Sequence, residues 1–282
     1  MGAVGRLEQR LRGEGKAERT VLEYVKWARR LARWCVLQGF DIETLEPHQV
    51  RDWVDQTVPD SRESRKQAYT ALSHLYRMLE RTDEPWAAIR VPLKPRGKPR
   101  PLTEAQRVAL RDTAVMVGGR KGLATVGILQ TAARPSEVAQ WRWDGVELYD
   151  TPDDSGAHGR LRFWRTKVRD WHQVPLRPLL ADQLERSRPA HAEAFIFAGN
   201  NGRPHVTTEA VWEWVREVGR LAGIDGVNPR RLRSTAITTV LEATDSLDLA
   251  AEIAGHRDPE VTRSYYAHTS WVRLSGASVA LD

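Results

Sequence analysis

The sequence predicts a mainly α-helical protein with one small antiparallel β-sheet, divided into two domains. Three observations lead to this prediction. Apolar residues follow helical spacing over most of the chain, and only the stretch around residues 146–175 is rich in the branched and aromatic residues typical of strands. A proline-rich segment at residues 90–101 interrupts the helical pattern. With 282 residues, the chain is long enough for one large domain or two ordinary ones.

The first ninety residues are predicted to form a small all-helical domain. Apolar residues recur at helical spacing over residues 16–38, 47–56 and 61–81, and no segment there alternates with a period of two. Pro47 suits the first turn of the second helix. Ser61 suits the N-cap of the third, where its hydroxyl can accept a backbone hydrogen bond.

Residues 90–101 are predicted to form an extended linker. The segment holds four prolines and one glycine in twelve residues, so it cannot continue a helix. Its charged residues are five cations and no acid, namely Arg90, Lys94, Arg96, Lys98 and Arg100. The whole chain has a formal charge of +6, so most of the net charge lies in this segment. We expect these five side chains to follow a nucleic-acid phosphate backbone.

The second predicted domain, residues 102–282, mixes helices with strands. Thr103 and Gln106 form a capping-box pattern that opens its first helix. Helical spacing predicts helices over about 103–117, 120–131, 135–142, 178–188, 207–222, 230–243, 247–254 and 258–268. Strands are predicted over Val146–Tyr149, Leu161–Thr166 and Trp171–Pro175, with a turn at Lys167–Asp170.

The composition excludes several classes of protein and of site. A single cysteine, Cys35, excludes a disulfide framework and a cysteine-based zinc site. No apolar run approaches membrane-spanning length and the N-terminus lacks a secretory signal, so we expect a cytoplasmic protein without a membrane partner. Glycine-rich phosphate loops, a His-Glu-x-x-His motif and an acidic cluster for two metals are missing from the sequence. We therefore expect no cofactor and no metal, and any phosphodiester chemistry would depend on cations and a side-chain nucleophile.

Four segments of the second domain carry reactive residues in a fixed order. The first places Arg134 at the start of a predicted helix, and the second places Lys167 on the predicted hairpin turn. The third places Arg230 and Arg233 one helical turn apart, and therefore on one face. The fourth contains His256, which is followed nine and ten residues later by two tyrosines, Tyr265 and Tyr266.

Each of these residues, taken alone, has an ordinary structural explanation. Arg134 with Glu137 is a common helical ion pair, and we assign Glu137 to orienting Arg134. A lysine in a polar turn is usually solvated surface, and two arginines on one helix face can simply touch phosphates. The joint order and spacing of the four segments is what indicates catalysis.

This order resembles that of the tyrosine recombinase (phage integrase) family, and the likeness covers most of the chain. The first box of that family is typically Thr-Gly-Leu-Arg-x-Ser-Glu, which Arg134, Ser136 and Glu137 match. The family lysine lies on a β-turn eight residues before a proline, as Lys167 does before Pro175.

The remaining two motifs lie closer to the C-terminus. The family motif His-x-Leu-Arg corresponds to Arg230–Arg233, and Leu-Gly-His before the nucleophilic tyrosine corresponds to Ala254–His256. A spacing of nine residues between the histidine and the nucleophilic tyrosine selects Tyr265. A spacing of ten residues, which occurs with a proline at the position of Pro259 and a Tyr-x-His ending, selects Tyr266, which we favour.

The resemblance implies a fold and an activity. The fold is a helical, SAM-like core-binding domain at residues 1–89, a linker at 90–101 and an α+β catalytic domain at 102–282. The activity is that of a site-specific recombinase or integrase, which cleaves and rejoins DNA by type IB-like transesterification through a 3′-phosphotyrosyl intermediate, without ATP or metal. The implied partners are double-stranded DNA, further copies in a homotetramer on two DNA sites, and accessory directionality proteins. The implied setting is a bacterial cytoplasm or nucleoid, with a phage, plasmid or other mobile element as the origin.

The resemblance also implies a role for each matched residue. Arg134 and Arg233 would bind the non-bridging oxygens of the scissile phosphate, where negative charge increases during attack. The nucleophilic tyrosine would attack phosphorus, and Lys167 would protonate the departing 5′-oxygen. His256 would donate a hydrogen bond to the phosphate.

Two positions depart from the family pattern. Arg230 stands where the family has a histidine that helps to move the tyrosine proton. An arginine is a poor base but can still bond a phosphate oxygen, so we expect altered efficiency more than loss of function. Ala132 and Ala133 replace Gly-Leu of the first box, which changes packing and not chemistry.

Two other functions stay open. One is a catalytically weakened DNA-binding relative with a regulatory or architectural role, of which Arg230 would be an early sign. The other is a helical adaptor whose arginines contact proteins. Within the favoured function, the pattern fits integration, excision, resolution and transposition equally.

Overall fold

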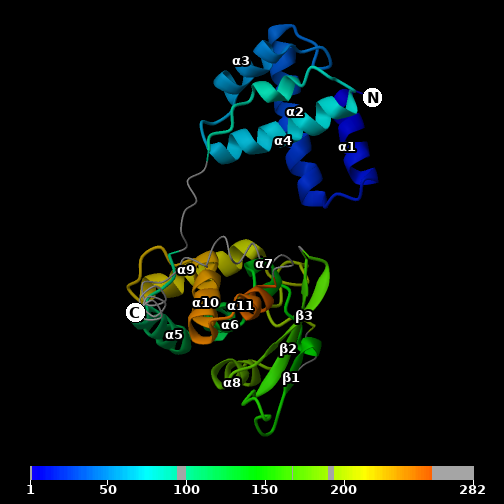
Figure 1. Cartoon of the computed structure of the whole chain (residues 1–282). Helices are drawn as coiled ribbons and strands as arrows, with labels where there is room; N and C mark the ends of the chain where they lie inside the picture. Colours follow the sequence, from blue (N-terminus) through cyan, green and yellow to red (C-terminus); the bar gives the residue numbers. More distant parts are fainter. Residues whose placement is uncertain (1, 94–99, 167, 190–193, 256–282) are drawn as a thin grey trace, which may run out of the picture. The chain divides into compact units, whose positions relative to one another are not determined.

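The computed structural model describes residues 2–93, 100–166, 168–189 and 194–255 (Figure 1). The chain divides into two compact units, Met1–Gly97 and Lys98–Asp282. Its described residues are mostly helical, with one three-stranded antiparallel sheet, which confirms the predicted fold class. The predicted helix at 258–268 lies outside the described residues.

The N-terminal unit is helical throughout its described secondary structure. Its elements are α1 (Ala3–Gly13), α2 (Glu18–Gln38), α3 (Pro47–Thr57), α4 (Arg62–Met78) and the 3₁₀ helix η1 (Pro85–Ala88). Helix α2 packs along α4 and α1, and η1 packs against α3 and α4. The predicted helices at 16–38, 47–56 and 61–81 are confirmed to within a few residues. Helix α1 was not predicted, and it buries a narrow stripe of Ala3, Leu7 and Leu11.

Aromatic packing forms much of the core of this unit. Trp53 and Trp86 are fully buried. Trp27 meets Trp53 edge to face with ring centroids 6.3 Å apart, and Tyr76 stacks on Trp86 at 6.4 Å. Fully burying a large apolar side chain contributes roughly 1.5–3 kcal/mol, so these rings stabilise the unit substantially.

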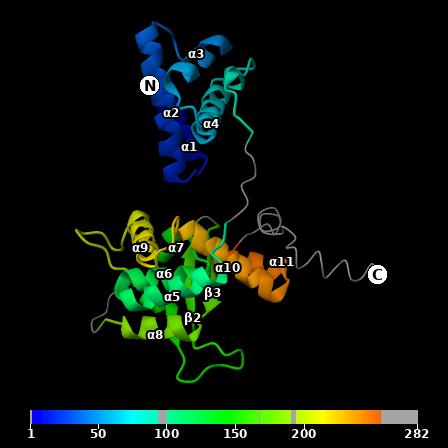
Figure 2. The same cartoon turned by 90° about the vertical axis from the view of Figure 1, so that its left-hand side faces the viewer.

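The second unit is built around one buried helix, α6 (Gly119–Thr131). The longer helices that pack against it are α5 (Glu104–Val117), α8 (Pro178–Arg186), α9 (Thr208–Leu221) and α10 (Pro229–Thr244). Helix α10 also packs against α11 (Leu247–Ala254) (Figure 2). A Cβ at Gly127 would lie 2.7 Å from the ring of Trp141, so a glycine there lets the indole lie directly on α6.

Helix α7 (Pro135–Val138) is shorter than the predicted helix at 135–142. The chain leaves the helix to bury Trp141, whose indole lies near the rings of Phe163 and Phe197. The carbonyl of Trp141 accepts the backbone N–H of Ile196 at 2.9 Å, so its backbone bonds outside the helix as well. Tertiary packing of one large side chain therefore overrides the local helical pattern.

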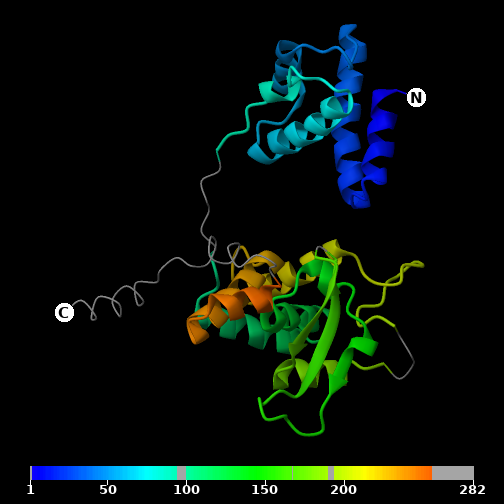
Figure 3. The same cartoon turned by 45° about the vertical axis from the view of Figure 1, so that its right-hand side comes forward.

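The sheet has the order β1–β2–β3, from β1 (Val146–Leu148), β2 (Gly159–Arg165) and β3 (Asp170–Pro175). The three predicted strands are confirmed, with pairs such as Leu161–Val174 and Phe163–His172 in register. Leu161, Phe163 and Val174 are buried, whereas Trp164 and its pair Trp171 are exposed on the other face. The sheet lies at one side of the helices (Figure 3).

Helix α10 also holds the segment that leads into the second unit. Arg231 donates from Nε to the carbonyl of Arg100 at 3.0 Å, and from Nη2 to the side chain of Gln106 at 3.3 Å. The backbone N–H of Leu102 donates to the buried hydroxyl of Thr235 at 2.9 Å. The chain from Arg100 to Gln106 is therefore fixed to the same helix that carries Arg233.

Candidate active site

Arg134 is positioned by the junction between α6 and α7. It is the N-cap residue of α7, with an extended backbone, and Pro135 follows at the first helical position. Its Nη1 donates to Oε1 of Glu137 at 2.9 Å, and its backbone N–H donates to Oε2 at 2.7 Å. The Glu137 side chain is only 2% exposed, whereas that of Arg134 is 22% exposed. A buried carboxylate thus holds a guanidinium that still reaches solvent.

Arg233 connects the ends of two helices. It donates from Nη1 to the carbonyl of Ala132, the C-cap of α6, and from Nη2 to the carbonyl of Ala254, the last residue of α11. Carbonyls at helix C-termini carry partial negative charge, so a guanidinium is a favourable partner there. Because Ala132 lies two residues before Arg134, Arg233 brings α10 and α11 to the segment that carries Arg134.

Arg230 lies in the first turn of α10, one turn before Arg233. Its side chain is exposed, and no hydrogen bond or ion pair joins it to another described residue. The neighbouring Arg231 points to the linker end instead, through its contacts with Arg100 and Gln106. These two adjacent arginines therefore differ in environment: Arg230 faces solvent, and Arg231 binds the end of the linker.

The β2–β3 hairpin contributes Arg165, a residue that the motif analysis did not select. Arg165 is the last residue of β2 and pairs with Asp170, and its Nη2 lies 3.7 Å from Oδ2 of Asp170. The alternation of Leu161, Phe163 and Arg165 on the inner face of β2 is a signal that the sequence does contain. A charged residue at the third inward position is unusual, and could have been noticed.

His172 faces the same side of the sheet as Arg165. Its ring meets Phe163 edge to face with centroids 5.4 Å apart. Burial lowers the pKa of His172, the charge of Arg165 lowers it further, and the carboxylate of Glu137 opposes this shift. Its neutral imidazole fits a packed position beside cations.

The C-terminal end of α11 closes this region. Gly255 caps the helix in the left-handed conformation, with φ +60°, where a glycine has little strain. The guanidinium of Arg165 packs on Gly255, since a Cβ there would lie 1.8 Å from Nη1. Gly255 directly precedes His256 in the chain, and Lys167 follows two residues after Arg165.

The described residues thus bring together the four segments in which catalytic residues were predicted. Arg134 and Arg233 lie within this cluster, and the chain approaches Lys167 and His256 from Arg165 and Gly255. The predicted residues Lys167, His256, Tyr265 and Tyr266 themselves lie outside the described residues. Of the linker cations, Arg90 and Arg100 are exposed, whereas Lys94, Arg96 and Lys98 also lie outside the described part.

Residues 102–271 match the phage integrase family, which is more than half of the chain. The chain belongs to this family. Among curated phage integrase relatives, the tyrosine recombinase XerA of Thermococcus kodakarensis is 24% identical over 262 residues, covering 89% of this chain and 86% of that protein. The tyrosine recombinase XerD of Mycobacterium tuberculosis H37Rv is 29% identical over 198 residues, covering 63% and 60%.

Solved structures show the same phage integrase fold. The XerH recombinase bound to its difH substrate matches with a TM-score of 0.71 and 15% identity, over 93% of this chain and 79% of that one. A lambda integrase dimer bound to a COC′ core site matches with a TM-score of 0.69 and 17% identity, over 91% and 94%. The small sheet and the helices around α6 are therefore those of a tyrosine recombinase.

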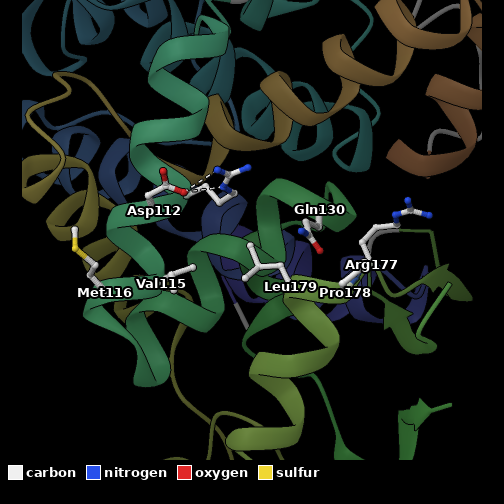
Figure 4. Close-up of a pocket in the computed structure, with 8 residues that line it drawn as sticks. Asp112, Val115, Met116, Gln130, Arg177, Pro178 and Leu179 are labelled. Atoms are coloured by element: carbon white, nitrogen blue, oxygen red, sulfur yellow. Dashed lines mark hydrogen bonds and ion pairs between the residues drawn. The ribbon is translucent and has the colours of Figure 1, made fainter. Parts of the chain in front are cut away.

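Three further findings concern metal binding, membrane spanning and pockets. Within the described ranges, no three His, Cys, Asp or Glu residues are grouped closely enough to hold a metal ion, and no helix there is long and apolar enough to cross a membrane. A pocket of about 590 Å³ lies among α5, α6 and the start of α8 (Figure 4). Val115, Met116, Leu179 and Arg177 are among its lining residues, and none of the described catalytic candidates, Arg134, Arg230 and Arg233, lines it.

Proposed function

We propose that the chain is a site-specific DNA recombinase that cleaves and rejoins DNA through a 3′-phosphotyrosyl intermediate. The observation that carries this proposal is the contact of Arg233 with the carbonyls of both Ala132 and Ala254. This contact joins the Arg134 segment to the end of the helix that precedes His256. Two arginines from separate helices then face one region, as a phosphate with two non-bridging oxygens requires.

The proposed reaction is a transesterification at phosphorus. The tyrosine oxygen, Tyr266 in our preference and Tyr265 in the alternative, forms a bond to phosphorus and releases its proton to solvent. The bond from phosphorus to the 5′-oxygen breaks, and Lys167 gives a proton to that oxygen. Rejoining reverses these steps with a 5′-hydroxyl of a second strand. The bond count is conserved, so the reaction needs no ATP.

The charges around the site support this assignment of roles. Arg134 keeps a part of its guanidinium in solvent while Glu137 fixes its direction, so it can bind an incoming phosphate oxygen with little reorganisation. Arg233 would bind the other oxygen, and His256 would donate a hydrogen bond to the phosphate. Arg230, exposed at the start of α10, would contact a phosphate oxygen as a cation, in place of a proton-moving histidine.

DNA is the proposed partner. The solved XerH, lambda integrase and Tn1549 integrase structures that match this fold are described as complexes with DNA. Here the linker cations Arg90, Lys94, Arg96, Lys98 and Arg100 would neutralise backbone phosphates. We further propose residues 1–89 as the core-binding domain, residues 102–282 as the catalytic domain, and a homotetramer on two DNA sites as the active assembly.

The experiment that tests this function is trapping of a covalent adduct. The full chain is incubated with a pool of nicked suicide duplexes of randomised sequence, and protein-bound DNA is isolated on a denaturing gel and sequenced. We expect a band that resists denaturation, enriches a defined sequence and forms equally well in EDTA. Sequence-selective binding without any adduct would contradict the proposal and favour the non-catalytic relative. A strict magnesium requirement would contradict the mechanism.

A further inference from the structure

Arg165 is a largely buried cation that the proposed reaction does not yet use. Its side chain is only 13% exposed, and its one described ion pair, to Asp170, is long at 3.7 Å. Its Nε is buried and has no hydrogen-bond partner among the described residues. Burying a guanidinium is costly, so a position of this kind indicates a specific requirement for the residue.

The backbone of Arg165 closes the hairpin turn. Its carbonyl accepts the N–H of Val168 at 3.2 Å and the N–H of Arg169 at 2.8 Å. Arg169 adopts a left-handed conformation with φ +52°, which completes the reversal of the chain before Asp170. Lys167 itself lies outside the described residues and stands between Thr166 and Val168 in the sequence.

The side chain of Arg165 reaches the opposite wall of the site. A Cβ on Gly255 would lie 1.8 Å from Nη1, 2.9 Å from Cζ and 3.0 Å from Cδ of Arg165, so the guanidinium fills the place of a side chain there. Gly255 is the C-cap of α11, and Arg233 binds the carbonyl of the residue before it. Arg165 and Arg233 therefore meet the same helix end, from β2 and from α10.

We propose that Arg165 is a positioning residue that holds the Lys167 turn against the C-terminal end of α11. This inference rests on the proposed function, because it assigns Lys167 the role of proton donor to the 5′-oxygen. One residue closes the turn through its backbone and fixes it to α11 through its side chain. Without this contact, the β2–β3 hairpin would hold Lys167 less precisely relative to Arg134 and Arg233.

The charge pattern is consistent with this role. The cations facing the cluster are Arg134, Arg165 and Arg233, and the carboxylates described beside them are Glu137 and Asp170. Asp170 is mostly exposed, so it offsets the charge of Arg165 only weakly. The excess positive charge favours an anionic ligand, which would strengthen the docking of the hairpin when DNA is bound.

The test compares Arg165→Ala and Arg165→Lys with a matched control, Arg162→Ala, in the full chain. Arg162 lies on the same strand but on its outer face, with its guanidinium 4.4 Å from the ring of Trp171. Cleavage is measured on the duplex selected by adduct trapping, and on the same duplex with sulfur in place of the bridging 5′-oxygen. A thiol with a pKa of about 8.5 leaves without a proton, so that substrate does not need Lys167.

We expect Arg165→Ala to cleave the normal duplex about a hundredfold more slowly, with a much smaller change in DNA affinity, because a misplacement near 1 Å has an effect of that order. We expect the sulfur-substituted duplex to restore its rate. We expect Arg165→Lys to be as slow as Arg165→Ala on the normal duplex, since an ammonium does not fill the place beside Gly255 that the guanidinium occupies. Arg162→Ala should cleave as the wild type does. Equal losses on both duplexes, or a wild-type rate for Arg165→Ala, would overturn the inference. Failure of the wild type to form any adduct would instead overturn the proposed function.

Discussion

Glu137 accepts two hydrogen bonds from Arg134, one from the guanidinium and one from the backbone N–H, at 2.9 and 2.7 Å. Both carboxylate oxygens are therefore used by a single residue three positions earlier in the chain. Since the Glu137 side chain is almost fully buried, its orientation is fixed by the core around it. The direction of the Arg134 guanidinium is thus set before any substrate is present.

Glu137→Gln should weaken both stability and cleavage. The amide keeps the volume of the side chain but removes the charge that pairs with Arg134, and losing a hydrogen bond to a charged group costs about 1–3 kcal/mol. We expect a lower free energy of unfolding in urea and slower adduct formation. Glu185→Gln, at an exposed position of α8, is the control. An unchanged adduct rate in Glu137→Gln would show that Arg134 does not depend on this carboxylate.

Arg233→Lys should abolish most of the cleavage activity although it keeps the charge. A lysine ammonium cannot donate in two fixed directions, so it cannot join Ala132 and Ala254 while also binding a phosphate. Loss of one donor to a developing negative charge typically slows a reaction by about a hundred- to a thousandfold. Single-turnover cleavage measures this, with Arg220→Lys in the exposed last turn of α9 as the matched control. A rate within about threefold of wild type would exclude a bidentate role.

Ala132→Gly should be neutral or slightly stabilising, in contrast to Ala250→Gly. Both alanines are fully buried, but Ala132 has φ +52° whereas Ala250 lies within α11. Relief of a left-handed alanine gains about 1–2 kcal/mol, which offsets about 0.8 kcal/mol for the lost methyl group. At Ala250 the methyl loss adds to about 1 kcal/mol of helix propensity. Urea unfolding of both variants checks this, and equal destabilisation would contradict it.

The lowered pKa of His172 predicts that the protein loses stability at acidic pH. Burial and the charge of Arg165 hold its pKa in the folded protein below the ordinary value of 6.5, so the unfolded chain binds the proton more tightly. The free energy of unfolding should fall as pH decreases from about 7 through 6.5 toward the lowered pKa. His172→Gln should reduce this slope. A slope that is identical in wild type and His172→Gln would contradict the prediction.

The basic linker predicts a steep salt dependence of DNA binding. Each phosphate contact contributes about 0.9 to the slope of log affinity against log salt concentration. The triple variant Lys94→Ala, Arg96→Ala, Lys98→Ala should therefore bind with a slope smaller by about 2–3. Fluorescence anisotropy on the selected duplex at several salt concentrations measures the slope. Arg186→Ala, an exposed position on α8, should not change it, and an unchanged slope in the triple variant would remove the linker from the DNA interface.

Local chemistry explains why so much of the fold could be predicted. The Ser61 hydroxyl accepts the N–H of Ser64 at 3.1 Å, and Thr103 accepts that of Gln106 at 3.2 Å, as their capping patterns indicate. Where prediction failed, packing between distant segments decided the structure. Trp141 ends α7 early because its ring fills space between α6 and the sheet.

The candidate site shows the same division. Arg134 and Arg233 could each be selected from a short motif. The spacing of each from its motif partner, Glu137 or Arg230, is a local property of one helical turn. Arg165 could not be selected in this way, since its significance depends on Gly255, ninety residues later in the chain. An alternating-strand pattern would have placed it on the inner face, but only the tertiary structure brings α11 to that face.

Identification of the covalent bond between protein and DNA tests the central claim most directly. The adduct formed with the selected nicked duplex is digested, and the peptide that carries the nucleotide is sequenced by mass spectrometry. We predict a 3′-phosphotyrosyl bond on Tyr266, present in wild type and Tyr265→Phe and absent from Tyr266→Phe. A bond on Tyr265 would reverse our preference between the two tyrosines. Adduct formation by the double variant Tyr265→Phe, Tyr266→Phe, or a bond to any other residue, would contradict the account.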